Sequence, residues 1–154
     1  MEAEGVFGDD CLELIYFETL LKLDPSTFTV AMFNCFKEFF LHTNAQYGQI
    51  EILALGNFKA YTHNLIGIEA LWSIVLSVVD ENTYRTSLEF LIRLFKRLEM
   101  NEEIKIYILD VCMSNIKSGL DITEDNALLI TRSIHVLDCF ISDFELNQSN
   151  KAPK

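Results

Sequence analysis

Hydrophobic residues recur at intervals of three and four along most of this chain, the spacing of amphipathic α-helices. The pattern predicts six helices in three pairs, at 9–43, 63–98 and 102–144. Successive pairs recur near the ~40-residue period of HEAT and armadillo repeats. No residue motif repeats from pair to pair, so a closed helical bundle is the alternative to an open α-α superhelix.

The first pair is predicted from two adjoining segments, 9–23 and 24–43. Asp9 or Asp10 is the candidate N-cap of its first helix, and Pro25 suits the first turn of the second. We expect the second helix to end near Asn44 and Gly48. The predicted inward residues are Leu12, Ile15, Tyr16, Thr19, Leu20 and Leu23, then Phe28, Met32, Cys35, Phe36 and Phe39.

Residues 45–62 contain too many apolar side chains for a plain surface loop of this length. Both a short helix and a folded-back hairpin agree with this segment.

Residues 65–79 form a helix that is apolar around more of its circumference than a surface helix needs. The apolar run between Glu69 and Asp80 is shorter than the ~20 residues that cross a bilayer. We therefore expect a buried central helix, covered on both sides by other helices. The predicted core residues are Leu71, Trp72, Val75 and Leu76, with Phe36 and Phe39 before them and Leu91 and Phe95 after them, and Val79 also belongs to the stripe.

Three further helices follow, and Asn82 is the candidate N-cap of the first of them. The next is expected over 102–118, with Gly119 as its C-terminal stop. The last has a capping-box-like Asp121 and Glu124, with Thr123 as the alternative cap. Its predicted inward stripe is Ala127, Ile130, Ile134, Leu137 and Ile141. We expect one helical-repeat domain over 9–144, between a flexible N-terminus (1–8) and a flexible tail (145–154).

Composition narrows the functional classes. The formal net charge of −11 disfavours binding to nucleic acid or to anionic membranes, because either needs a basic surface. Half of the residues are apolar, which favours an open stack whose end faces are covered by neighbouring repeats. The N-terminus lacks the features of a secretory signal, and Cys11, Cys35, Cys112 and Cys139 form no disulfide pattern. A soluble cytoplasmic protein is therefore expected.

Several stretches resemble one family. The run "FKEFF" (36–40), then Asn44, then "LIGIEALWSIVLSVVDENTYRTSLEFLIRLFKRL" (65–98) resembles the non-catalytic region of the very large ubiquitin-specific proteases of the Fat facets type. The likeness continues through "TRSIHVLDCFI" (131–141). Ala70 departs from the pattern, which has a larger aromatic residue there.

The resemblance implies an armadillo-like scaffold far from the catalytic domain of a cysteine-type deubiquitinase. It transfers no catalytic residue to this chain, because none of the four cysteines lies in the family's nucleophile motif. The alternative is a self-contained helical adaptor of an unrelated assembly.

Other candidate chemistry has simpler explanations. His135 and Cys139 lie one helical turn apart, but Asp138 and Asp143 would raise a thiol pKa rather than lower it. Acidic pairs at 80–81, 102–103 and 124–125 fall at helix starts, where negative charge is stabilising. No phosphate-binding loop is present in the sequence. We expect no enzymatic activity, no cofactor and no metal.

One helix carries the main basic concentration of this acidic chain, at Arg85, Arg93, Lys96 and Arg97. Glu89 and Arg93 are spaced for an i,i+4 ion pair. A solvated helix face is the simplest interpretation. The alternative is a docking strip for an acidic segment of a protein partner, because repeat arrays bind extended ligands along one helical layer. The expected partners are proteins and the neighbouring repeats of a longer chain.

Overall fold

The computed structural model describes residues 8–98, 102–120 and 124–149. These form α1 (Asp9–Glu18), α2 (Val30–Gln46), α3 (Ile68–Ser77), α4 (Glu81–Lys96), α5 (Glu102–Ser118) and α6 (Glu124–Ser149). Short 3-10 turns lie at Leu20–Lys22, Pro25–Thr27 and Ala54–Gly56. Two strands, β1 (Ile50–Ile52) and β2 (Phe58–Ala60), pair antiparallel. The prediction of an all-α fold is confirmed.

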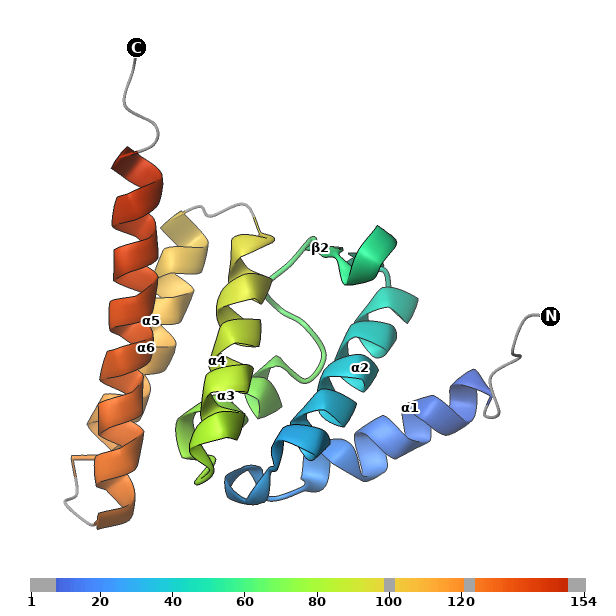
Figure 1. Cartoon of the computed structure of the whole chain (residues 1–154), viewed down its shortest axis with the longest axis horizontal. Helices are drawn as coiled ribbons and strands as arrows, with labels where there is room; N and C mark the ends of the chain where they lie inside the picture. Colours follow the sequence, from blue (N-terminus) through green and yellow to red (C-terminus); the bar gives the residue numbers. More distant parts are fainter. Residues whose placement is uncertain (1–7, 99–101, 121–123, 150–154) are drawn as a thin grey trace.

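The three helix pairs contact one another in chain order, but the two helices of the second and third pairs are reversed within each pair. Contacts join α1 to α2, α2 to α4, α4 to α3, α3 to α6 and α6 to α5. Figure 1 shows α2, α4 and α6 side by side, with α1 crossing at one end of the row and the β-hairpin near the ends of α2 and α4. Each of the three predicted helix pairs is therefore in contact, and the hairpin is the main addition to the helical pattern.

The core is rich in phenylalanine. Rings from α2, α4 and β2 meet in a row, with centroid separations of 5.9 Å for Phe36–Phe40, 5.9 Å for Phe40–Phe90 and 6.1 Å for Phe58–Phe90. Seven of the eight predicted core residues are buried: Phe36, Leu71, Trp72, Val75, Leu76, Leu91 and Phe95. Phe39 is only partly buried, because the buried face of α2 runs through Phe33, Phe36 and Phe40 and leaves Phe39 beside Leu12 and His42.

α3 has the enclosed position expected for residues 65–79. It contacts α4, α6 and the 3-10 turn at Pro25–Thr27. Val79 is an exception, with 75% of its surface exposed, because the helix ends at Ser77 and the chain continues extended through Val78.

The backbone of Ile66 is tied to two helices before α3 begins. The buried Asn44 side chain accepts a hydrogen bond from Ile66 N (2.8 Å) and donates one to Ile66 O (3.0 Å). The Tyr16 hydroxyl donates to the same carbonyl at 3.0 Å. Gly67 follows with φ +88°, and a Cβ there would clash with the Tyr16 hydroxyl. Only glycine therefore suits this position.

Helix starts differ from the predicted ones. Gly8 precedes α1, so Asp9 and Asp10 lie within its first turn instead of capping it. Thr29 caps α2, because Pro25 belongs to a separate 3-10 turn. Asp80 rather than Asn82 caps α4, accepting from Thr83 N at 2.8 Å. Hydrogen bonds from Thr83 hold the pKa of Asp80 below its usual range. The predicted caps Asp121 and Thr123 lie outside the described residues.

The predicted inward face of α6 is wrong at three of its five residues, whereas Leu137 packs against the core and Ile130 is partly buried. Ile134 and Ile141 are 54% and 47% exposed, and Ala127 is also exposed. The buried face instead carries Arg132, Ser133, Val136 and Phe140, so polar side chains occupy positions that an apolar pattern would not identify. The helix continues to Ser149, where the sequence suggested a flexible tail from residue 145.

Residues 45–62 contain both of the expected alternatives, a hairpin and a single 3-10 turn at its tip. Leu55 in this tip has φ +61° and is 99% exposed. A left-handed backbone is unfavourable for leucine, and an exposed leucine buries no surface that would compensate. The hairpin tip is therefore a strained position.

The central position of α3 predicts that Val75→Asp and Leu76→Asp each abolish cooperative thermal unfolding. Both side chains are buried, and an unpaired buried carboxylate is far more costly than a cavity. Ser73→Asp, on the exposed side of the same helix, is the control and should still unfold cooperatively. A cooperatively melting Val75→Asp protein would contradict an enclosed α3.

The strained tip predicts that Leu55→Asn raises the free energy of unfolding by about 1 kcal/mol, because asparagine adopts left-handed backbone more readily than leucine. Urea denaturation would measure the change. Leu53→Asn is the control, since Leu53 has φ −103° and should gain nothing. Equal effects of the two substitutions would show that backbone strain is not the cause.

Candidate docking surface

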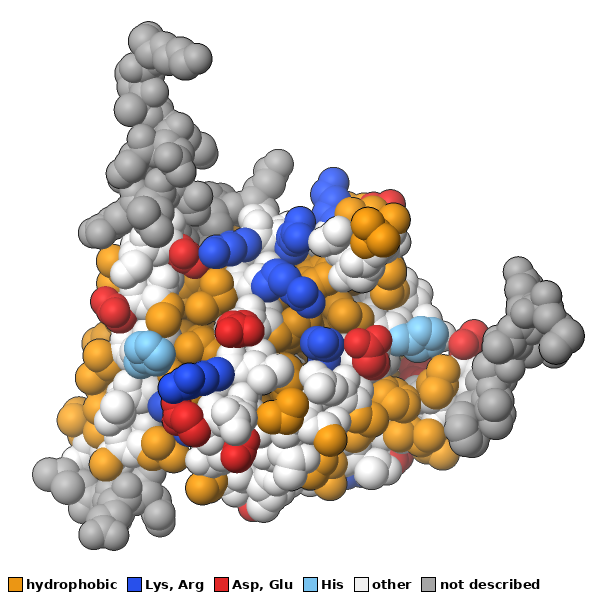
Figure 2. All heavy atoms as spheres, in the orientation of Figure 1, with side chains coloured by type: hydrophobic (Ala, Val, Ile, Leu, Met, Phe, Trp, Pro, Cys, Tyr) orange, Lys and Arg blue, Asp and Glu red, His pale blue; other side chains and the backbone are white. Residues whose placement is uncertain are grey.

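The four basic residues predicted as a docking strip lie along α4 and its C-cap. Figure 2 shows Lys and Arg side chains gathered over α4 and the neighbouring segments on this face. All four predicted residues are exposed: Arg85, Arg93, Lys96 and Arg97.

Two of the four cations are balanced within the chain. Arg85 pairs with Glu81 at 3.4 Å, one turn earlier on α4, and Lys96 pairs with Asp143 of α6 at 3.1 Å. Exposed ion pairs of this kind contribute little to stability. They nevertheless neutralise two cations that an acidic partner would otherwise bind. The predicted strip is therefore not a uniform row of free cations.

Arg93 and Arg97 face the β-hairpin instead. The Arg97 guanidinium donates to Asn57 Oδ1 at 3.1 Å. The Arg93 guanidinium lies over two rings, 5.4 Å from the centroid of Phe58 and 5.7 Å from that of Phe90. The predicted Glu89–Arg93 ion pair does not form in the described part of the chain. Cation–π contacts with the two rings therefore hold the Arg93 guanidinium in place.

A lysine from another helix joins this arrangement. Lys37 of α2 and Arg93 together line two adjoining hollows, of about 200 Å³ and about 430 Å³. The smaller lies between α2 and α4 over Phe33 and Phe90, and the larger reaches the hairpin. Sequence periodicity did not indicate Lys37, because its role depends on α2 lying beside α4. Its position in the phenylalanine-rich run "FKEFF" was the available signal.

We call these two hollows the hairpin groove. The shared wall is Lys37 and Arg93, the apolar walls are Phe33, Leu41, Ile52, Leu55, Phe58 and Phe90, and the remaining lining residues are Glu38, His42, Gly56, Asn57, Thr86 and Glu89.

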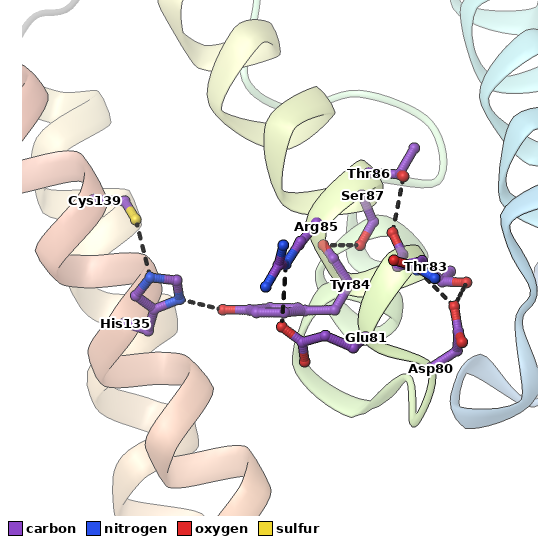
Figure 3. Close-up of polar contacts among 10 residues, drawn as sticks. Asp80, Glu81, Thr83, Tyr84, Arg85, Thr86, Ser87, His135 and Cys139 are labelled. Atoms are coloured by element: carbon purple, nitrogen blue, oxygen red, sulfur yellow. Dashed lines mark hydrogen bonds and ion pairs between the residues drawn. The ribbon is translucent and has the colours of Figure 1, made fainter.

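His135 and Cys139 do come together, with a third residue. The Tyr84 hydroxyl lies 2.6 Å from His135 Nδ1, and Cys139 Sγ lies 3.7 Å from His135 Nε2 (Figure 3). Burial raises the pKa of the Cys139 thiol, and the charges of Asp138 and Asp143 raise it further. A thiol held in its protonated form is a poor nucleophile, so this contact joins α4 to α6 without an activated sulfur.

Cys112 and the acidic residues Glu81 and Glu102 have structural explanations. Burial raises the pKa of Cys112 to about 11, so this thiol is neutral at physiological pH. Glu81 pairs with Arg85, and Glu102 pairs with Lys105 at 2.7 Å. Within the described ranges, no cluster of His, Cys, Asp and Glu is arranged to hold a metal ion. No helix built from these residues has the length and hydrophobicity to cross a membrane.

Arg132 is a buried charge that the sequence pattern did not reveal. Its guanidinium donates to the Val78 carbonyl just after α3 and lies 4.1 Å from the centroid of Tyr84. Burial lowers its pKa. Arg132 therefore joins α6 to α4 and to the end of α3. An apolar side chain at this position would leave the Val78 carbonyl without the hydrogen bond from Arg132.

No protein-family model matches this chain, and no curated protein matches its sequence.

Proposed function

We propose that this chain is a non-catalytic helical scaffold and protein-docking segment, with an armadillo-like stacking of its three helix pairs. The observation that carries the proposal is an apolar outer face on α5 and α6. The exposed side of α5 carries Ile106, Leu109 and Met113, spaced three and four residues apart. This side lies opposite the buried residues Ile104, Ile108 and Cys112.

α6 carries exposed apolar side chains as well. Ile134 and Ile141 are spaced two turns apart and are about half exposed. Figure 2 shows apolar side chains along the edge of the molecule that α5 and α6 form in Figure 1. Paired apolar stripes on two packed helices are suited to a further helical layer, as between the repeats of a solenoid. A neighbouring repeat of a longer chain is the proposed occupant.

The parent protein proposed for this scaffold is a cysteine-type deubiquitinase of the Fat facets type, and its proposed setting is the cytoplasm. The support is the sequence resemblance described above. Two of its separated parts also contact each other in space, because Asn44 binds the backbone of Ile66 within the "LIG" motif at 65–67. The basic residues of α4 are the proposed contact for acidic segments of protein partners.

Lysine substitutions test the outer face. Leu109→Lys combined with Ile134→Lys should leave the melting temperature nearly unchanged, because both side chains are about half exposed. We expect the unaltered chain, with this face uncovered, to self-associate with rising concentration and to bind a hydrophobic dye, and the double variant to lose both, measured by analytical ultracentrifugation and fluorescence. Ser114→Lys with Ser142→Lys places equal charge on exposed polar positions of the same helices and is the control. Association that survives in the first variant would contradict an adhesive outer face.

The non-catalytic role predicts that the chain does not cleave ubiquitin conjugates or a fluorogenic ubiquitin substrate at neutral pH. The physical reason is that its best-placed thiol, Cys139, has a raised pKa. Steady-state fluorescence would measure the turnover. Thiol-dependent activity that disappears in Cys139→Ser would overturn the prediction.

A further inference from the structure

We propose that the hairpin groove binds a linear peptide segment of a partner protein that combines acidic and apolar residues. A carboxylate of the peptide lies between Lys37 and Arg93, and an apolar side chain packs against the hairpin tip at Leu55. This inference rests on the proposed docking function and gives it a location and a partner chemistry.

The charge on the shared wall is the first argument. Arg93 is held by Phe58 and Phe90, so little side-chain entropy is lost when it binds a carboxylate. No ion pair engages Lys37 or Arg93 in the described part of the chain, in contrast to Arg85 and Lys96. Two cations that converge from different helices on the same hollow match a carboxylate ligand.

Two carboxylates on the groove restrict the choice of partner. Glu38 and Glu89 line the hollows beside Lys37 and Arg93. A continuous polyanion such as nucleic acid would place negative charge next to both of them, which is repulsive. A peptide can place one acidic side chain between the cations and apolar side chains elsewhere. The mixed lining therefore favours a peptide.

The hairpin tip is the second argument. Leu55 combines a left-handed backbone with 99% exposure, and the neighbouring Ile52 and Leu53 are 54% and 44% exposed. Strained residues persist where they serve a function, and Leu55 lines the groove. An apolar side chain of the peptide would cover this leucine and bury surface that the free chain leaves in water.

The size of the groove supports a short segment rather than a folded surface. Hollows of about 430 Å³ and about 200 Å³ each accommodate a few side chains. They adjoin along the line between α4 and the hairpin, which suits an extended chain.

Fluorescence anisotropy with short labelled peptides tests the proposal. The probes combine Asp or Glu with Leu or Phe, and matched probes carry Asn or Gln in place of the acids. We expect the acidic probes to bind and the amide probes to bind about tenfold more weakly, as for loss of a charged hydrogen bond. Binding should also weaken with added salt.

Three groove variants and one control variant locate the site. Arg93→Gln and Lys37→Gln should each weaken binding about tenfold, whereas Arg85→Gln, outside the groove, should have no effect. Leu55→Asn should weaken binding severalfold while its melting temperature stays equal to or above that of the parent chain. This combination separates a lost contact from a damaged fold.

Two results would overturn the proposal. One is the absence of any probe binding that depends on both the acidic residue and Arg93. The other is a homodimer, detected by sedimentation and disrupted by Arg93→Gln, because the groove would then be an interface between copies of this chain. Neither result changes the dye-binding readout of the outer-face test on Leu109 and Ile134, so the two proposals can fail separately.

Discussion

The fold depends on the partly buried backbone N–H and C=O of one residue, Ile66. A backbone N–H and C=O in the interior must find hydrogen-bond partners, or their desolvation is uncompensated. Asn44 bonds to both groups, and Tyr16 bonds to the carbonyl. These contacts join α1 and α2 to the chain just before α3, and they require the small, left-handed Gly67 directly afterwards. The position and direction of the most apolar helix therefore follow from two polar side chains.

The position of α3 also determines the arrangement of the residues that line the hairpin groove. α4 follows α3 after a short turn capped by Asp80, and it packs beside α2 through Phe90, Phe33 and Phe40. The β-hairpin closes one end of this pair through Phe58. Lys37 and Arg93 face the same hollow because their helices share this aromatic row. The candidate site is thus a consequence of how the core is packed.

Sequence periodicity predicted the helices well because burial of one face is a local property of each segment. It failed where a contact depends on distant residues. The apolar stripe of α6 was expected inside, but Ile134 and Ile141 are about half exposed, and Arg132 is buried because it meets the Val78 carbonyl and Tyr84 across the fold. The sequence pattern could place four basic residues on one helix: Arg85, Arg93, Lys96 and Arg97. It could not identify the residues of other elements that they contact, which are Asp143, Asn57 and Phe58. Lys37 and the strained Leu55 could be identified only after α2, α4 and the hairpin were assembled.

Arg132 also determines how α6 is positioned against α3. Apolar helix faces can slide past each other at modest cost, because many offsets bury similar areas. A guanidinium that donates to the Val78 carbonyl and lies against Tyr84 is satisfied at one offset, and a buried cation without its acceptor is strongly penalised. The Arg132 side chain therefore fixes the position of α6 along α3. α6 carries part of the outer apolar face. A further helix pair packed on that face would take its position from α6, and therefore from the contact between Arg132 and Val78. The position of each added pair would then be fixed relative to the pair before it.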